Sequence, residues 1–258
     1  MRGWARRWRA GARTAALLAG SLLASGAAVA GPPFRTDDPI PVDYQHWEIY
    51  GFSTATGIRG DTSGTLPGLE VNYGAVPNVQ LHMIVPLAFD QPAGGGWQEG
   101  YGDTELGVKY RFLQEDTQGW LPMAAIFPAV DLPTGDAERG LGTGHTHAFL
   151  PLWLQKSFGP WSSDAGLGYW INPGGDNKNY WFFGWELQRQ VTKRLALGGE
   201  IFHQTADIEG GEDSTGFNLG FIYDFSAHHH LLVSAGSGIE NAGATDDFSY
   251  YLAYQLTF

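Results

Sequence analysis

The sequence predicts an all-β fold, a closed antiparallel transmembrane β-barrel of about 12 strands. Three observations support this prediction. Aromatic residues make up 14% of the 258 residues and glycines number 37, a composition typical of strands and turns. Apolar and polar residues alternate with a period of two, as side chains along a strand do. Beyond residue 30, no apolar run reaches the roughly 18 residues that a membrane-spanning helix needs.

The first thirty residues have the pattern of a secretory signal peptide. Five arginines precede an apolar run of small residues that ends in Ala28-Val29-Ala30, a typical cleavage site. We expect 1–30 to be removed, so that the mature chain begins at Gly31. Cleavage takes away five arginines and no acids, which leaves 10 basic against 27 acidic residues and a formal charge of −17. Such a surface argues against nucleic acid as a partner.

The barrel is predicted over 45–258. In the last segment, Tyr250, Leu252 and Tyr254 alternate with smaller or more polar neighbours up to Phe258, so one face is apolar. The same alternation, interrupted by Gly- and Asp-rich stretches, places twelve strands at 45–57, 65–75, 79–89, 99–112, 119–131, 144–157, 161–172, 179–190, 193–204, 215–226, 229–237 and 248–258.

The predicted connections alternate in length. Short ones are expected at 76–78, 113–118, 158–160, 191–192 and 227–228, and mostly longer ones at 58–64, 90–98, 132–143, 173–178, 205–214 and 238–247. This asymmetry is typical of bacterial outer-membrane barrels and predicts periplasmic N and C termini. Each proline inside a strand removes a ladder donor, so bulges or shifted boundaries are expected at Pro86, Pro122, Pro128 and Pro151.

A soluble β-sandwich would show the same alternation. Aromatic residues near strand ends favour a barrel instead, because outer-membrane barrels carry aromatic girdles at both membrane interfaces. The expected location is therefore the outer membrane, with its lipid as one partner. The chain-terminal Phe258 also looks like the signal that the barrel assembly machinery recognises, which makes that machinery a second expected partner.

Short motifs along the chain carry a family resemblance. They cover nearly the whole mature chain, at 34–39, 101–107, 132–135 with 140–142, 150–156, 169–174 and 180–185. In order and spacing they resemble the outer-membrane β-barrel transporter and porin family associated with the meta-pathway of phenol degradation. The resemblance implies a barrel that transports small solutes, with small aromatic compounds as the leading suggestion.

Charged residues on the predicted inner face are the pore-lining candidates. With Trp170 they are Glu48, Glu70, Asp103, Glu105, Lys109, Arg111, Asp164, Glu186, Arg194, Glu200 and Asp224. The alternative is that these groups pair across neighbouring strands and fill a narrow lumen. Acids outnumber bases in this set, so a permeation path is expected to disfavour anions. Inward aromatic residues are also predicted, at Tyr50, Phe52, Phe202 and Tyr251.

The segment 31–44 does not alternate like a strand. With Phe34, Asp37 and Asp38 as candidates, it is expected either to enter the lumen as a small plug or to lie in the periplasm. A turn at Asp38-Pro39 is a better interpretation of the two adjacent acids than a cation site.

Neither a metal, a cofactor nor catalysis is expected. His145 and His147 share a strand face, but two ligands make no convincing metal site, and 228–230 is a histidine triplet at a predicted turn. A barrel lipid hydrolase would need a serine beside a histidine, and His203 has no such neighbour in the sequence. The expected function is a channel for passive uptake of small solutes. A lipid hydrolase and a plugged structural barrel are the alternatives.

Overall fold

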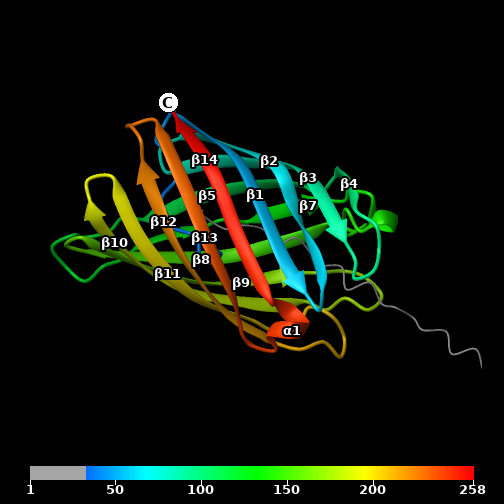
Figure 1. The fold of residues 1–258 in the computed structure, drawn as a ribbon. Coiled ribbons are helices and arrows are strands. Elements are labelled where there is room, and N and C mark those ends of the chain that lie inside the picture. Colours follow the sequence, from blue (N-terminus) through cyan, green and yellow to red (C-terminus); the bar gives the residue numbers. More distant parts are fainter. Residues whose placement is uncertain (1–32) are drawn as a thin grey trace, which may run out of the picture.

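The structure, a computed structural model, describes residues 33–258; the predicted signal peptide at 1–30 lies outside these residues. The described chain forms one sheet, with the 3-10 helix η1 (Ala137–Arg139) and the one-turn helix α1 (Ala242–Thr245) in connections (Figure 1). The strands are β1 (Trp47–Ile58), β2 (Asp61–Val76), β3 (Val79–Gln91), β4 (Gln98–Tyr101), β5 (Thr104–Leu113), β6 (Met123–Ile126), β7 (Ala129–Leu132), β8 (His147–Phe158), β9 (Trp161–Ile171), β10 (Tyr180–Thr192), β11 (Leu195–Gln204), β12 (Ser214–Asp224), β13 (His229–Glu240) and β14 (Phe248–Thr257).

The sheet closes on itself through antiparallel pairs. β1 pairs with β2 on one side and with β14 on the other, where Glu48 lies opposite Thr257 and Gly57 opposite Phe248. β4 and β5 share one position in the ring, because both pair with β3; β6 and β7 share another, because both pair with β5 and β8. Residues 33–258 therefore make a ring of twelve strand positions, and the predicted closed 12-strand antiparallel barrel is confirmed.

The prolines lie where the ladder is interrupted. Pro128 lies in the break between β6 and β7, and Pro151 of β8 lies opposite that break, where its carbonyl accepts the N–H of Phe127. Pro86 lies where β3 changes partner from β5 to β4, and Pro122 precedes β6. A proline supplies no N–H, so interruptions collect at these positions, as expected.

The predicted turn at 191–192 lies two residues later, at 193–194, and two other predicted connections differ more in length. The expected loop at 58–64 is only the pair Arg59-Gly60, because positive φ at both residues (52° and 89°) permits a tight two-residue hairpin turn. The expected short turn at 113–118 is longer, since β6 begins only at Met123 and the predicted strand start at 119 is too early. The other long connections lie at 92–97, 133–146, 172–179, 205–213 and 241–247.

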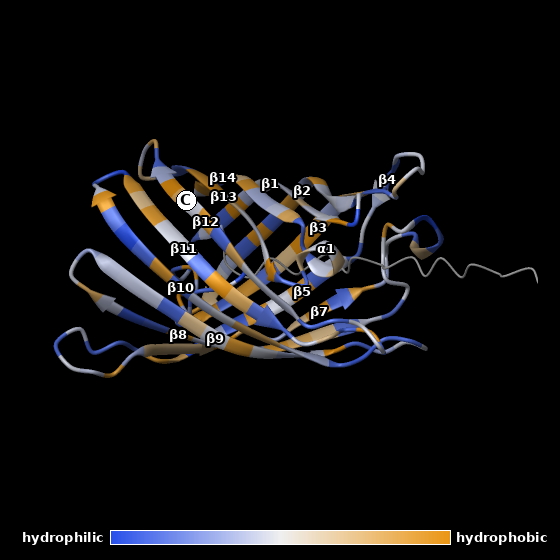
Figure 2. Ribbon diagram, turned by 60° about the horizontal axis from the view of Figure 1, so that its bottom comes forward, coloured by the Kyte–Doolittle hydropathy of each residue, from blue (hydrophilic) through white to orange (hydrophobic). Residues whose placement is uncertain are grey.

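The two faces of the wall differ in polarity, as the alternating bands along the strands in Figure 2 show. On β10, Trp181 and Trp185 are 42% and 49% exposed, whereas Phe182 and Glu186, which directly follow them, are buried. Large exposed apolar side chains recur on the outside of the described strands, as the lipid-facing surface of a transmembrane barrel requires. In the same residues, no helix has the length and apolar character to span a membrane.

The start of β1 and the carboxyl terminus lie at the same end of the barrel. Trp47 and Phe258 exchange two backbone hydrogen bonds, with N···O distances of 2.7 and 3.0 Å. The turns at 77–78, 159–160 and 193–194 join neighbouring strands at this end, and α1 lies at the opposite end of β14 (Figure 1). We call these the short-turn end and the long-loop end.

Candidate functional site

The residues before β1 cross the interior of the barrel. We call 33–42 the inner segment; Phe34, Thr36 and Asp37 in it are at most 2% exposed. Near β1, the N–H of Val42 donates to the side chain of Gln80 on β3 (2.9 Å). At its other end the carbonyl of Pro33 accepts from the hydroxyl of Ser234 on β13. These two strands are well separated around the ring, so the segment obstructs the lumen in this structure.

Lys109 on β5 holds the middle of the inner segment. Its ammonium donates to Oδ1 of Asp37 (3.0 Å) and to the carbonyl of Asp38 (2.9 Å), and it lies 5.0 Å from the ring centroid of Phe127. Burial raises the pKa of Asp37 to about 6, and the charge of Lys109 opposes that rise without cancelling it. This ion pair fixes the segment to one side of the barrel.

Glu200 on β11 holds the segment on the opposite side. Its two carboxylate oxygens accept the backbone N–H groups of Arg35 and Thr36 and the hydroxyl of Thr36, each at 2.8 Å. Asn218 of the neighbouring strand adds a fourth donor at 2.7 Å. Hydrogen bonds to a charged group are stronger than those between neutral groups, so Glu200 is a second anchor of the inner segment. The alternation of the sequence alone does not reveal this role.

Arg35 connects the inner segment to the long-loop end. Its guanidinium lies 4.3 Å from the ring centroid of Phe202 and donates to Oδ2 of Asp246 at 2.9 Å, just after α1. Burial raises the pKa of Asp246, and Arg35 opposes the rise. The segment therefore contacts the walls, the aromatic lining and one long loop together.

Most of the sequence-predicted interior residues are buried among the strands. Seven are buried within the barrel, namely Glu70, Glu105, Lys109, Asp164, Trp170, Glu186 and Glu200. Glu48, Asp103, Arg111 and Asp224 are only partly buried, and Arg194 is exposed in the turn after β10. The aromatic candidates Tyr50, Phe52, Phe202 and Tyr251 are all at most 5% exposed.

Several of the partly buried candidates have local partners away from the middle of the lumen. Arg111 donates to the side chain of Asn78 in a turn (2.6 and 3.1 Å), and Asp224 pairs with His230 at 2.7 Å. Asp103 holds the connection 133–146: its carboxylate accepts the N–H groups of Gly135 and Thr143 at 2.9 and 2.7 Å. Asp103 thus draws that loop toward the β4–β5 junction.

A hydrogen-bonded chain links the two buried acids of β2 and β5. The imidazole of His82 contacts the side-chain oxygen of Asn72 at 2.6 Å and the carboxylate of Glu105 at 2.8 Å, and Asn72 donates to Glu70 at 2.8 Å. Sequence reasoning missed His82, although its place on the inner face of β3, between Gln80 and Ile84, was the available signal.

Three acids lie side by side at one level of the wall. Glu186 on β10 is directly opposite Asp164 on β9 and Glu200 on β11. Gln155 donates to Asp164 at 2.8 Å. Oδ2 of Asp164 and Oε1 of Glu186 are buried without a hydrogen-bond partner among the described residues. Like charges directly opposite each other repel, so this acidic row attracts positive charge.

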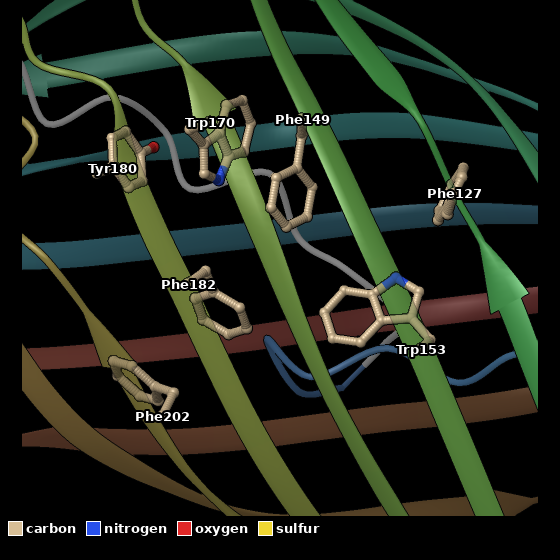
Figure 3. Close-up of a cluster of buried hydrophobic side chains, with 7 residues drawn as sticks. All are labelled: Phe127, Phe149, Trp153, Trp170, Tyr180, Phe182 and Phe202. Atoms are coloured by element: carbon tan, nitrogen blue, oxygen red, sulfur yellow. The ribbon is translucent and has the colours of Figure 1, made fainter.

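Aromatic side chains cover the wall between the acidic row and the long-loop end. Trp170 stacks on Phe149 (centroids 4.6 Å apart), Trp153 and Phe182 meet at 6.2 Å, and Phe182 stacks on Phe202 at 6.4 Å (Figure 3). We call this surface the aromatic wall, formed by Phe127, Phe149, Trp153, Trp170, Tyr180, Phe182 and Phe202. Sequence reasoning found only Trp170 and Phe202 of this group.

The histidines outside the wall do not gather into a metal site. His147 is buried, and its Nε2 has no hydrogen-bond partner among the described residues. His228 and His229 contact the carbonyl of Thr257 and the hydroxyl of Tyr254. Within residues 33–258, no group of three or more His, Asp or Glu side chains is arranged to hold a metal ion.

The closed ring, the apolar outer face and the charged interior define the class of this molecule as a transmembrane β-barrel of the outer-membrane type. The chain belongs to the family described as "Putative MetA-pathway of phenol degradation", whose model matches residues 50–255. The family expected from the sequence motifs is thereby confirmed.

Solved structures show the same fold. An outer membrane channel from Pseudomonas putida F1 is similar with a TM-score of 0.66 and 16% identity, over 85% of this chain and 97% of that one. The KdgM porin matches with a TM-score of 0.58 and 9% identity, over 82% and 99% of the two chains. The NanC porin matches with 0.51 and 8%, over 81% and 98%. No curated protein sequence matches the chain.

Proposed function

We propose that this protein is an outer-membrane channel for the passive entry of small solutes, with small aromatic compounds as the favoured class. The observation that carries the proposal is the interior itself. A row of acids with two unpartnered side-chain oxygens continues into an aromatic wall, and a non-strand segment held by side-chain contacts crosses the lumen. A barrel built for stability alone gains little from buried acids whose side chains keep an oxygen without a hydrogen-bond partner among the described residues, as Asp164 and Glu186 do.

The aromatic wall supports the aromatic part of the proposal. Offset and edge-to-face contacts between rings are favourable beyond the area they bury, so a flat solute can exchange one ring contact for the next along Trp170, Phe149 and Phe182. The acidic row supports the charge selectivity, because excess inward carboxylates lower the local concentration of anions. Uncharged phenol should therefore enter faster than benzoate.

Orientation and export complete the proposal. We infer that the short-turn end faces the periplasm, since short periplasmic turns and longer outer loops are usual in these barrels. We also infer that residues 1–30 direct export and are then removed, which the intact mass of the mature protein tests. We further propose that Phe258, which follows β14 and is 57% exposed, is part of the signal that the barrel assembly machinery recognises.

Hydrolysis is disfavoured by the geometry at the lipid-facing rim. There Nδ1 of His203 contacts the hydroxyl of Thr215 at 2.9 Å, and the same hydroxyl donates to Glu240 at 2.8 Å. In a catalytic triad the imidazole lies between the hydroxyl and the carboxylate. Here the hydroxyl lies in the middle, so the carboxylate does not orient the base.

Uptake into protein-containing liposomes tests the channel. Phenol, benzoate, a neutral sugar and a short cationic amine form the panel, and protein-free liposomes of the same lipid give the background permeation. The proposal expects the protein to raise the entry of phenol and the amine above background by more than it raises the entry of benzoate, and weak cation selectivity in planar bilayers. Anion selectivity would contradict the acidic lumen, and background uptake of every solute would favour a plugged structural barrel.

A further inference from the structure

The phenyl ring of Phe34 lies on two glycines of the wall. Gly198 on β11 and Gly220 on β12 are paired across the strands. A methyl group added at either glycine would lie only 2.9 or 3.1 Å from a ring carbon of Phe34. Phe34 itself is 2% exposed. The two glycines thus form a shelf with room for one aromatic ring.

A carboxylate lies directly beside this shelf. Glu200 follows Gly198 by two residues on the same inner face of β11, which is about 6.6 Å along a strand. The inner segment supplies three donors to it, the N–H groups of Arg35 and Thr36 and the hydroxyl of Thr36. All three are neutral, although the acceptor is charged.

The inner segment thus places a ring on the shelf and three hydrogen-bond donors on the carboxylate. A primary ammonium also has three donors, and unlike the three donors of the segment it is itself charged, since the Arg35 guanidinium pairs with Asp246 instead. In 2-phenylethylamine a two-carbon link joins the ring to the ammonium, which suits the spacing from the shelf to Glu200. The buried acids Glu186, on the adjoining strand β10, and Asp164, on the next strand β9, add to the preference for a cation.

We propose that the shelf of Gly198 and Gly220, together with Glu200, is a binding site for arylethylamines, and that the inner segment occupies it as an internal substitute for the solute. An amine that binds there displaces Phe34, Arg35 and Thr36. It thereby releases one of the two anchors that hold the segment across the lumen. This inference rests on the proposed channel function and names one solute class for it.

Calorimetric titration of the full-length mature protein in detergent tests the site. Three ligands share the phenyl ring and differ in charge: 2-phenylethylamine, 2-phenylethanol and 3-phenylpropionate. We expect the amine to bind more tightly than the alcohol, and the acid not to bind. Equal affinities for amine and alcohol would overturn the proposal.

Four variants separate the contribution of the shelf from that of the carboxylate. Phe34→Ala empties the shelf and should raise the affinity for the amine about tenfold, because less of the protein is in the self-occupied state; Phe34→Leu, which still fills the shelf, should raise it less. Glu200→Gln should remove the preference for amine over alcohol. Gly198→Ala narrows the shelf and should weaken both ligands. A shift in gel mobility on boiling shows that each variant is folded.

The outcomes distinguish this proposal from the channel function. If the protein raises phenol uptake above that of protein-free liposomes but the amine preference is absent or survives in Glu200→Gln, the site is wrong and the channel stands. If the amine binds as expected but no solute enters liposomes, the site stands and the channel is wrong.

Discussion

Lys109 and Asp37 form an ion pair inside the barrel, 3.0 Å from nitrogen to oxygen, with side chains that are 5% and 0% exposed. One partner belongs to the wall and the other to the chain before β1. The pair therefore joins a closed sheet to a segment that is not part of it. Its loss should release the inner segment while the strands of the barrel stay paired.

Lys109→Met should open the lumen. The substitution keeps an apolar stem of similar length but leaves Asp37 buried without its cation, a loss that typically costs about 3–5 kcal/mol. Because the inner segment is outside the strand ladder, we expect it to leave the lumen, so single-channel conductance in planar bilayers should rise. The double variant Lys109→Met with Asp37→Asn removes the uncompensated charge and should conduct less than the single variant. Unchanged conductance would show that Lys109 does not retain the segment.

Acid should favour the closed state. The pKa of Asp37 is about 6 in the docked segment, against an ordinary value of 3.8, with Lys109 and Asp38 as the charges nearest to it. The docked state thus binds more protons, and the contribution of Asp37 to docking is present at low pH and lost as the pH rises through about 6. Asp246, whose pKa is also raised, acts in the same direction. Conductance should increase from about pH 4 to about pH 8. Asp37→Asn should reduce this increase, and a conductance that falls with rising pH in both proteins would contradict the prediction.

Trp185→Lys should impair assembly far more than Gln188→Lys. Trp185 is 49% exposed on the outer face, whereas Gln188 lies on the inner face, with its Cγ 2.8 Å from where a Cβ on Gly198 would be. A lysine on the lipid-facing side costs about 2–4 kcal/mol at mid-depth, and a lumen lysine can keep its hydration. Folding yield into lipid vesicles, read from the gel shift of unboiled samples, measures the difference. Similar yields would mean that the assigned faces are wrong.

Asp103→Ala should free the connection 133–146. Asp103 accepts the N–H groups of Gly135 and Thr143 as well as the hydroxyl of Thr143, at 2.7–2.9 Å. Loss of a charged acceptor that leaves such donors unsatisfied costs about 1–3 kcal/mol, and the expected result is faster proteolytic cleavage within this loop. Asp136→Ala in the same loop is the matched control, since Asp136 is exposed and its only hydrogen bonds among the described residues are those of its backbone carbonyl beside η1. Equal cleavage rates in the two variants would exclude Asp103 as the loop's anchor.

The strands were predictable because half of their side chains face lipid. Tyr250, Leu252 and Tyr254 alternate with inward residues, so a period of two marks both the element and its orientation. The broken strands were partly predictable, because Pro128 has no N–H to donate. The tight Arg59-Gly60 turn was not, since polar residues after it suggested a loop but belong to β2.

The site was less predictable for two physical reasons. On β8, Phe149 and Trp153 face inward while Leu150 and Leu154 face outward, so both faces are apolar and alternation disappears. The anchors of the inner segment join residues far apart in the sequence; Thr36 and Glu200 are 164 positions apart. No local pattern encodes such a contact.

The seam between β1 and β14 bears on the order of events in folding. Its pairs, such as Glu48 with Thr257, join the first strand of the sheet to the last. Contacts of such long sequence separation form late, because the chain entropy of bringing distant residues together must be overcome first. Until then β1 and β14 are open edges that can pair with other chains. Substitutions that weaken this seam should therefore appear as slower insertion and more aggregation during refolding, even where the finished barrel is hardly less stable.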